Sequence, residues 1–365
     1  MGMSQPKIEA ADVSVFTIPT DAPEADGTLQ WNSTTLVLVQ LMGSGVTGLG
    51  YTYGNQAIAI VARHLAEHCL IGQTFLDIPF LHQTMRQQIR NDGGQGITAM
   101  AIAALDIAAW DLKARFLNCS VSSLVGRAQT SISAYGSGGF TSYSNVQLSK
   151  QLSGWVQDGL TQVKMKIGSD PNSDPDRVKA ARKAIGEGVE LFVDANGAYS
   201  VKQAIALAHR FAESDVSWFE EPVSSDNLAG LCDIRHAVPC SMEIAAGEYG
   251  YDSFYFRRML EHSAVDVLQL DATRCMGFTG FLNAAAIANS FHIPLSAHCA
   301  PSLHMHVACS IPGFRHVEYF HDHVRIEDRL FDGFIAARNG RLEPDLSRPG
   351  LGLIFKRRDA KQLAA

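Results

Sequence analysis

The sequence lacks the features that mark several large classes of protein. It contains no run of lysine or arginine, and its formal net charge of −7 argues against a phosphate-backbone partner, so we expect no nucleic-acid binding. No apolar run reaches the roughly 18 residues that suggest a membrane span. The N-terminus lacks the basic and apolar parts of a signal peptide. We therefore predict a soluble cytoplasmic protein with no membrane partner.

Cysteine pairs are missing as well. The seven cysteines are odd in number and scattered, and none is spaced as C-x-x-C, so we expect reduced and mostly buried thiols. The composition instead favours a large folded core, because 46% of the 365 residues are hydrophobic, 18% are charged and the mean hydropathy is +0.01. A β/α barrel uses about 250 residues, which leaves room for one companion domain.

The first part of the chain combines strand and helix patterns. Lys7–Ile18 and Thr34–Leu41 read as extended segments, the second rich in β-branched residues, and the Ala-rich segment Ile97–Arg115 has the apolar spacing of a helix. Strands followed by helices indicate an α+β domain, which we place at residues 1–130. Residues 331–365 are rich in turns, and we expect them to pack back on this first domain and complete it.

From about Ser131 the pattern changes to short apolar runs that alternate with amphipathic helices. Eight buried strands separated by helices are what a parallel barrel requires, because parallel neighbours need crossover connections. We therefore predict an α/β fold with a TIM-type barrel over residues 131–330. The expected strands are Ile132–Tyr135, Val163–Lys166, Leu191–Asp194, Ser217–Glu220, Glu243–Ala246, Val265–Leu270, Ile293–Ala297 and His316–Tyr319.

Side chains that can take part in chemistry lie at or near the ends of these runs. They recur every 20 to 28 positions, about the length of one β/α unit, and should therefore gather at the carboxyl ends of the strands. This rim is the active-site face of such barrels. In chain order the residues are Lys164, Lys166, Asp194, Glu220, Glu248, Asp271, His298 and Glu318.

Three of these residues, Asp194, Glu220 and Glu248, are acids from successive strands. Three carboxylates within a few Å of one another would repel strongly and could not all stay ionised alone. A hard divalent cation resolves this conflict, and oxygen ligands with open positions suit Mg²⁺. The alternative is that each acid forms an unrelated salt bridge. The regular spacing of the three acids, one at each of three successive strand ends, favours the metal site over this alternative.

The remaining residues have the chemistry of acids and bases. Lys164 and Lys166 are two apart and share one face of a strand, so their charges should lower the pKa of at least one towards the range of a general base. Solvated lysines on an edge strand are the alternative. Asp271 and His298 come from consecutive units, where a carboxylate can fix the imidazole tautomer and leave the other nitrogen free to move a proton. The nearby His304, His306, His316, His321 and His323 are expected to be structural.

Together these motifs resemble the mandelate racemase subgroup of the enolase superfamily over nearly the whole chain. The matching segments are K-M-K at Lys164–Lys166, V-D-A-N at Val193–Asn196, W-F-E-E-P at Trp218–Pro222, A-A-G-E at Ala245–Glu248, the Asp271 and His298 pair, P-G-L-G near the C-terminus and A-A-L-D-I-A-A-W-D-L-K-A at Ala103–Ala114. The resemblance implies a modified (β/α)7β barrel with a capping domain, and Mg²⁺ held by the three acids. It also implies that Glu318 binds the substrate carboxylate and that Lys166 and His298 act on the two faces of the substrate carbon.

The resemblance further implies removal of the proton α to a carboxylate through a metal-stabilised enediolate. We expect loss of water from an acid sugar to give a 2-keto-3-deoxy acid, with racemisation or epimerisation of a 2-hydroxy acid as the alternative. The muconate-lactonising branch carries a second catalytic lysine where this chain has Asp271–Arg274. A catalytically silent barrel, kept for binding or structure, is a further alternative. We also expect a homo-oligomer with a small carboxylate as its substrate.

The segment Pro19–Asn32 is expected to be a loop of the capping domain that selects the substrate. It has no lysine or arginine but contains Asp21, Glu24 and Asp26, which would repel a second substrate carboxylate. We therefore expect a monoacid of the aldonate type rather than a diacid. Trp31 and Asn196 are further candidates for substrate contact. The alternative for the loop is a solvated surface turn.

Overall fold

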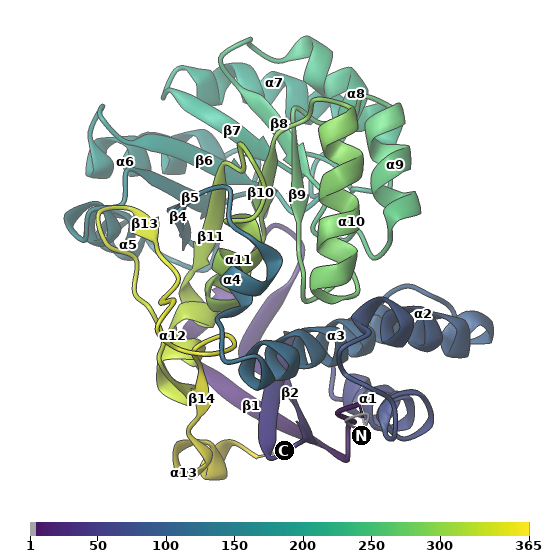
Figure 1. Ribbon diagram of the computed structural model, residues 1–365. Helices are drawn as coiled ribbons and strands as arrows, with labels where there is room; N and C mark the ends of the chain where they lie inside the picture. Colours follow the sequence, from purple (N-terminus) through teal and green to yellow (C-terminus); the bar gives the residue numbers. More distant parts are fainter. Residues whose placement is uncertain (1–4, 365) are drawn as a thin grey trace.

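A three-stranded antiparallel sheet opens the chain in the computed structural model, which describes residues 5–364 (Figure 1). Helices α1 and α3 pack against this sheet, and α2 packs against α3. A π-helical turn at Ala66–Leu70 follows α1, and a 3-10 turn at Ile89–Asn91 follows α2. The elements of this part, which we call the cap, are β1 (Ala10–Ala25), β2 (Gln30–Gly43), β3 (Val46–Tyr53), α1 (Ala57–Leu65), α2 (Ile78–Gln88), α3 (Ile97–Phe116) and the short α4 (Val121–Val125).

Strand β2 is apolar throughout its middle because both of its faces are covered. Successive side chains of a strand point to opposite faces of the sheet. Val37 and Val39 belong to the core beneath the cap helices, whereas Leu36 and Leu38 belong to the core that continues into the barrel. All four side chains are at most 1% exposed. The cap sheet therefore lies between its own helices and the rest of the molecule.

Eight parallel strands form a closed barrel, which confirms the predicted fold class. The strands pair in chain order, and β11 closes the ring by pairing with β4. Observed and predicted strands agree closely, although β4 is longer and both β9 and β10 are shorter than expected. The strands are β4 (Ile132–Gly138), β5 (Gln162–Lys166), β6 (Glu190–Asp194), β7 (Val216–Glu220), β8 (Glu243–Ala246), β9 (Val267–Leu270), β10 (Leu295–Ala297) and β11 (His316–Phe320).

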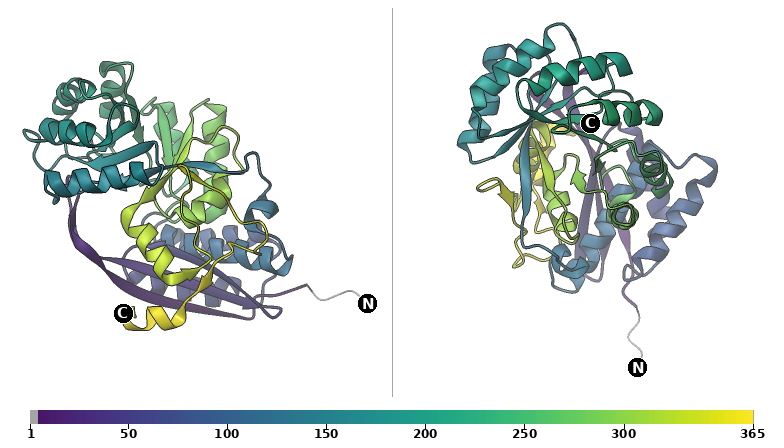
Figure 2. Two further views of the ribbon diagram at one scale, coloured as in Figure 1. Left: turned by 90° about the vertical axis from the view of Figure 1, so that its left-hand side faces the viewer. Right: turned by 90° about the horizontal axis from the view of Figure 1, so that it is seen from above.

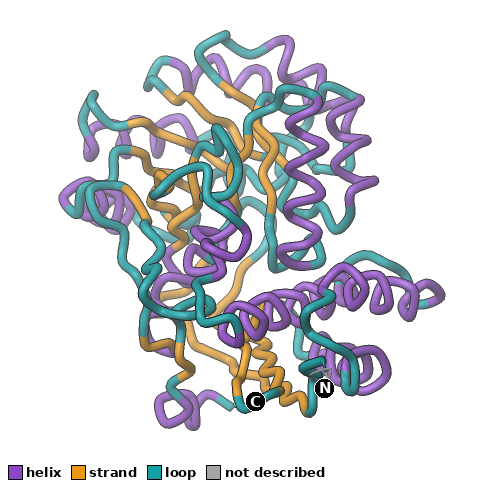
Figure 3. Tube along the Cα trace, in the orientation of Figure 1, coloured by secondary structure: helices purple, strands orange, loops and turns teal. Residues whose placement is uncertain are grey.

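Seven helices connect the barrel strands and surround them, and an eighth follows β11 (Figure 3). Two of them, α5 and α7, begin with a capping box. In each, the side chain of the serine before the helix accepts a hydrogen bond from the backbone amide of a glutamine three residues later, and the side chain of that glutamine accepts one from the backbone amide of the serine. The helices are α5 (Asn145–Gln157), α6 (Asp174–Ile185), α7 (Val201–Ala212), α8 (Leu228–Ala237), α9 (Ser253–Glu261), α10 (Gly277–Ser290), α11 (Pro301–Ala308) and α12 (His321–Leu330).

The Pro19–Asn32 segment is not a free loop, and this part of the sequence prediction was wrong. Strand β1 continues to Ala25, β2 begins at Gln30, and the two form a hairpin that reaches from the cap to the barrel (Figure 2). A register irregularity interrupts the pairing between Pro19 and Glu24. At the tip, a Cβ on Gly27 would lie 2.5 Å from the backbone oxygen of Ala195 and 2.7 Å from that of Ile167. Only glycine allows the hairpin to approach the ends of β5 and β6 so closely.

The last residues return to the cap. Phe355 packs against Phe16 of β1, with ring centroids 5.2 Å apart, and Ala364 forms a backbone bridge with Phe16. The short elements here are β12 (Phe331–Asp332), which pairs with β14 (Ile354–Phe355), β13 (Arg341–Leu342), which pairs with β4, α13 (Arg357–Ala360) and a 3-10 turn at Lys361–Leu363. Within residues 5–364, none of the helices has the length and apolar character needed to cross a membrane.

Candidate active site

The structure brings all eight predicted rim residues together at the carboxyl ends of the barrel strands. Each is at most 7% exposed. The two lysines lie on β5, and the other residues come from the ends of β6 to β10 and from β11. The positions are Lys164 and Lys166 in β5, Asp194 at the end of β6, Glu220 at the end of β7, Glu248 two residues after β8, Asp271 directly after β9, His298 directly after β10 and Glu318 in β11.

Three of these side chains have the arrangement of a metal-binding site. One carboxylate oxygen from each of Asp194, Glu220 and Glu248 lies within 4.8 Å of the other two. The buried Oε2 of Glu248 accepts no hydrogen bond, although His298 Nε2 lies 3.4 Å away. A buried carboxylate oxygen without a donor is costly, and a hard divalent cation that prefers oxygen ligands removes this cost. The residues present therefore fit Mg²⁺.

The two lysines are held by carboxylates, and the expected fall in a lysine pKa was wrong. Lys164 Nζ donates to Glu220 Oε1 at 2.5 Å, and Lys166 Nζ donates to Asp194 Oδ2 at 2.5 Å. Burial lowers the pKa of Lys166, but the nearby carboxylates of Asp194, Glu248 and Glu318 together raise it by more, and the net shift is upward; the pKa of Lys164 is also raised. Attraction to carboxylates at contact distance outweighs repulsion between the two ammonium groups.

Asp271 and His298 form the expected pair. His298 Nδ1 lies 2.8 Å from Asp271 Oδ2, and the other oxygen of Asp271 accepts hydrogen bonds from the amide and hydroxyl of Thr273, both at 2.7 Å. Burial raises the pKa of Asp271, but the hydrogen bond and charge of His298, together with the charges of Arg274 and His304, lower it by more, so the net shift is downward. An ionised Asp271 orients the imidazole, so that Nε2 points away from it and lies 3.2 Å from Cys299 Sγ.

Glu318 is held between Lys164 and the loop after β10. Its Oε1 lies 2.8 Å from Lys164 Nζ and accepts a hydrogen bond from Ser137 Oγ, and its Oε2 accepts one from the Cys299 amide at 3.0 Å. Cys299 and Ala300 both have positive φ, 54° and 38°, so this amide is aimed by a backbone conformation that L-residues rarely adopt. Lys164 and Glu318 together form a fixed polar group beside the acids.

The rim residues open into a cavity of about 410 Å³ that lies between the barrel and the cap hairpin. Lys166, Glu248, Asp271, His298 and Glu318 line it from the barrel, together with Asn196. The hairpin contributes Asp26, Leu29 and Trp31. The two residues that the sequence suggested for substrate contact, Trp31 and Asn196, therefore both face this space.

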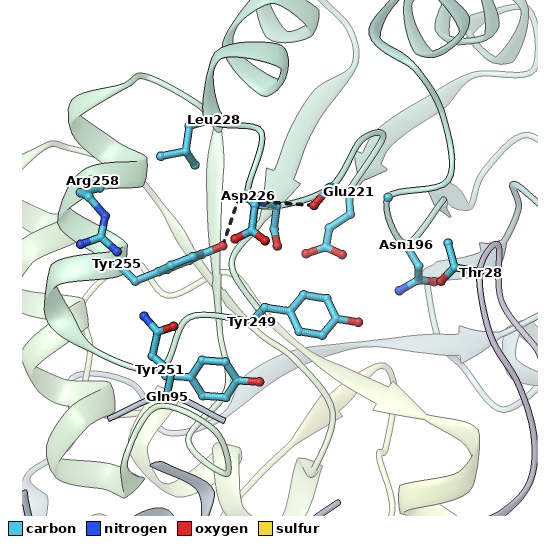
Figure 4. Close-up of a pocket in the computed structure, with 13 residues that line it drawn as sticks. Thr28, Gln95, Asn196, Glu221, Asp226, Leu228, Tyr249, Tyr251, Tyr255 and Arg258 are labelled. Atoms are coloured by element: carbon cyan, nitrogen blue, oxygen red, sulfur yellow. Dashed lines mark hydrogen bonds between the residues drawn. The ribbon is translucent and has the colours of Figure 1, made fainter. Parts of the chain in front are cut away.

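A second cavity, of about 710 Å³, shares Asn196 and Tyr249 with the first (Figure 4). Glu221, the neighbour of Glu220, lines it and lies between Asp226 and Asn196 in this view. Glu221 is 1% exposed, and its Oε1 has no hydrogen-bond partner. The cavity at the rim residues therefore adjoins a second cavity at Asn196 and Tyr249.

The acids of the hairpin do not form the repulsive surface that the sequence suggested. Asp21 pairs with His321 at 3.0 Å, outside the set of residues that line the cavity. Glu24 is 1% exposed and accepts a hydrogen bond from Trp31 Nε1, and burial raises its pKa to about 9. Asp26 does line the cavity, but its Oδ1 accepts two backbone hydrogen bonds within the turn, from Thr28 and Leu29. Of these three acids only Asp26 therefore lines the cavity, and its Oδ1 is held within the turn.

Arg274 is a cavity residue that the sequence analysis did not select. Its guanidinium donates to Glu248 Oε1 at 3.2 Å, lies 3.6 Å from Asp271 Oδ2 and stacks over the ring of Tyr249 at 5.0 Å. It lies on the turn after β9, three residues beyond Asp271. This short spacing from a predicted site residue is the sequence feature that could have identified Arg274. Arg274 therefore links the metal-binding acids to the Asp271–His298 pair.

Comparisons with known proteins agree with this geometry. Residues 11–126 match the family model of the mandelate racemase/muconate lactonizing enzyme N-terminal domain, and residues 147–360 match the enolase C-terminal domain-like model. The chain is 30% identical to 3,6-anhydro-alpha-L-galactonate cycloisomerase from Streptomyces coelicolor, over 88% of this chain and 89% of that protein.

Two solved structures are similar over almost their full length. A mandelate racemase/muconate lactonizing enzyme-like protein from Rubrobacter xylanophilus is 47% identical, with a TM-score of 0.95 over 98% of this chain and 100% of the other. L-talarate/galactarate dehydratase from Salmonella typhimurium, liganded with Mg and L-lyxarohydroxamate, is 25% identical, with a TM-score of 0.92 over 99% and 94%. The chain therefore belongs to the mandelate racemase/muconate lactonizing enzyme family of the enolase superfamily.

Proposed function

We propose that this enzyme removes water from an acid sugar of the aldonate type and releases a 2-keto-3-deoxy acid. The observation that carries the proposal is the pairing of Asp271 with His298 on the same cavity as Lys166. Lys166 and His298 come from β5 and β10, which lie three positions apart around the barrel. One group can therefore remove a proton while the other delivers one to a different substrate atom.

The proposed cofactor is Mg²⁺, held by Asp194, Glu220 and Glu248. When bound, Mg²⁺ supplies the positive charge that stabilises the dianionic enediolate formed by loss of the α-proton. The fit of the three carboxylates and the Mg in the liganded talarate/galactarate dehydratase both support this assignment. Arg274, which contacts Glu248, is positioned to keep that carboxylate in place.

The chain's own residues account for the rest of the reaction. Lys164 and Glu318 lie 2.8 Å apart, and in this proposal the Lys164 ammonium and the protonated form of Glu318 bind the substrate carboxylate. A divalent cation held by Asp194 would weaken the ion pair that raises the pKa of Lys166. Lys166, in its neutral amine form, takes the proton from the α-carbon, and the electron pair of the broken C–H bond forms the enediolate. His298, in its imidazolium form with protons on both ring nitrogens, then gives the Nε2 proton to the β-hydroxyl, whose C–O bond breaks, so that water leaves and the ring is left neutral with its proton on Nδ1. The resulting enol becomes the 2-keto-3-deoxy acid by taking up a proton at the β-carbon.

Racemisation or epimerisation of a 2-hydroxy acid is the second candidate. It is favoured by the same placement of Lys166 and His298 on one cavity, since a racemase needs a proton donor and acceptor on the two faces of one carbon. In that reaction His298 would return a proton to the α-carbon and no C–O bond would break.

An aldonate is preferred because the cations around the cavity already have partners. Lys166 pairs with Asp194, and Arg274 pairs with Glu248. Burial lowers the pKa of His323 to about 3, so this residue is neutral. Among the residues that line the cavity, we therefore find no spare cation for a second carboxylate. The hydroxyl groups of an aldonate instead meet Asn196, Thr35 and Asn55, which can exchange hydrogen bonds with them.

The test is a screen of the purified enzyme with Mg²⁺ against matched aldonates and aldarates, scored for 2-keto-3-deoxy acids. Lys166→Met should remove product formation, whereas Lys150→Met, at an exposed lysine of α5, is the matched control and should not. Isomerised acid with no keto product would establish the second candidate. A preference for aldarates would contradict the aldonate assignment.

Three wider assignments accompany this proposal. The barrel of residues 131–330 carries the catalytic groups, and residues 1–130 with 331–365 form the cap that selects the substrate. The protein acts in the cytoplasm as a homo-oligomer. Light scattering of the purified chain measures the oligomeric state directly.

A further inference from the structure

A second group of potential metal ligands lies where the cap hairpin meets the barrel, away from the three acids of the rim. Asp21 and Glu24 come from the irregular part of β1, and His321 is the first residue of α12. One ligand atom from each lies within 4.8 Å of the other two. Irregularities of this kind in a strand redirect side chains, and here they bring two acids to one imidazole.

The burial of Glu24 in this group is not explained by an ordinary ion pair. Asp21 and His321 alone would form a partly exposed pair, with side chains 49% and 24% exposed, of little consequence for stability. Glu24, however, is 1% exposed. Trp31 Nε1 donates to its Oε2 at 2.8 Å, whereas its Oε1 is buried without a hydrogen-bond partner. A buried carboxylate oxygen without a donor is expensive unless a cation or a proton joins it.

The surrounding charges add to this cost. Asp322 lies next to Glu24, and its charge disfavours ionisation of Glu24. The cation at this point, Arg325, donates to Asp322 Oδ1 at 2.7 Å and to the backbone oxygen of Pro19 at 2.8 Å. Three acids therefore share one arginine that is committed to one of them. A divalent cation supplies the missing positive charge.

We propose that Asp21, Glu24 and His321 form a second metal site, distinct from the Mg²⁺ site, that binds Zn²⁺ or a similar first-row transition-metal ion. Imidazole is a ligand for Zn²⁺ and its neighbours in the series, whereas Mg²⁺ prefers oxygen ligands and retains its waters. One histidine and two carboxylates give three protein ligands, the number at which Zn²⁺ keeps an open position for water.

The site would fasten the hairpin over the substrate cavity. Asp21 and Glu24 belong to the cap, and His321 directly follows β11, the strand that carries Glu318. Glu24 also holds the indole of Trp31, which lines the cavity and packs edge-on against Phe140 of the barrel with ring centroids 5.6 Å apart. A metal ion at this position therefore fixes a wall of the cavity without touching the reacting atoms.

The test measures bound zinc in the full-length chain after chelation, loading with Zn²⁺ and removal of free metal. Since Zn²⁺ can also occupy the rim acids, the Glu248→Gln variant isolates the second site. The wild-type chain should retain two equivalents of zinc, Glu248→Gln one, and Glu248→Gln combined with His321→Ala none. His209→Ala, at an exposed histidine of α7, is the matched control and should lose nothing.

A second measurement guards against misfolding of the His321 variant. Asp21→Asn changes a half-exposed side chain, and in the Glu248→Gln background it should weaken zinc binding at least tenfold. Zinc should raise the melting temperature of Glu248→Gln and have a smaller effect once Asp21 is changed. Zinc content that is equal with and without His321 and Asp21 would overturn the proposal and leave Glu24 as a buried, protonated carboxyl group.

Discussion

Asp271 Oδ2 lies 2.8 Å from His298 Nδ1, and this contact joins the ends of two neighbouring barrel strands. Thr273 holds the other oxygen of Asp271, so the carboxylate cannot rotate away from the imidazole. The proton of the neutral ring therefore lies on Nδ1, and Nε2 is directed to a space that Glu248 and Glu318 border at 3.4 and 3.8 Å. This geometry makes His298 dependent on Asp271 for its chemistry.

Replacement of Asp271 by asparagine should lower kcat by about 10²–10⁴-fold, because the amide no longer stabilises the charged imidazole or fixes its tautomer. Steady-state kinetics with the best acid sugar measures this loss. Asp233→Asn, at an exposed position of α8, should be close to wild type. An Asp271→Asn enzyme with full activity would remove the pair from the mechanism.

His298→Asn should separate the two candidate reactions. In a dehydratase, Lys166 still removes the α-proton, so the variant should exchange that proton with solvent deuterium while it forms no keto acid. NMR in D₂O follows exchange and product together. Exchange that depends on the substrate's configuration, lost with His298 for one configuration and with Lys166 for the other, would instead fit a racemase.

Removal of divalent metal should abolish activity, and Mg²⁺ should restore it. Glu248→Gln should weaken Mg²⁺ binding at least tenfold, because it removes one of three charged ligands. Calorimetric titration with Mg²⁺ measures the affinity. Glu243→Gln, at the opposite end of β8, is the matched control, since Glu243 pairs with Arg315 away from the three acids. Undiminished turnover after exhaustive chelation contradicts the assignment.

Glu327 should give a measurable pH dependence of stability. Burial raises its pKa from 4.5 to about 7, an effect that the hydrogen bonds from Ser302 and Tyr51 only partly offset. The folded state therefore holds this proton more tightly than the unfolded chain. The resulting stabilisation is complete below about pH 4.5 and is lost as the pH rises through 7.

Urea denaturation of wild type and Glu327→Gln between pH 4.5 and 8 tests this. The free energy of unfolding of wild type, relative to the variant, should fall by up to about 1.4 kcal/mol per pH unit over this window. Contributions from the metal-binding acids are common to both proteins and cancel in the difference. Parallel curves would show that the pKa of Glu327 is the same in the folded and unfolded states.

Gly27→Ala should impair substrate binding more than it impairs folding. The added Cβ meets the backbone oxygens of Ala195 and Ile167, which cannot move aside, so the hairpin tip must shift from the barrel. We expect KM to rise about tenfold with a modest change in melting temperature, because the barrel core is untouched. Gly188→Ala is the control, since no atom lies within 4 Å of its added Cβ. An unchanged KM would show that the tip plays no part in binding.

The barrel and its rim could be predicted because both depend on a short repeat. An apolar run followed by a polar residue every 20 to 28 positions places Asp194, Glu220 and His298 at one rim, whatever the loops between them do. The raised pKa of Lys166 could not be predicted in this way, because its sign depends on a distance of 2.5 Å to a carboxylate from another strand. Spacing along the chain does not fix that distance.

The hairpin and its contacts could not be predicted from the sequence, for a different reason. The segment from Pro19 to Asn32 was expected to be a loop of the capping domain, yet pairing with β2 resumes after the irregularity and extends the strand. The partners of Glu24 include Trp31 nearby and Asp322 almost 300 residues away. No local sequence pattern predicts a contact between residues so far apart in the chain. For the same reason the contact of His321 with Asp21 was not predicted, and His321 was expected to be structural.

The two-sided burial of β2 has a consequence for how the chain reaches its native state. Leu36 and Leu38 find their partners in a core that includes Leu330, Phe331 and Leu363, which follow them by almost 300 residues or more. Contacts of such long sequence separation form slowly, because a large loop must close before they are made. The cap sheet therefore leaves part of an apolar face uncovered until these distant residues have been synthesised, and a newly made chain depends on rapid closure of this long loop to avoid aggregation.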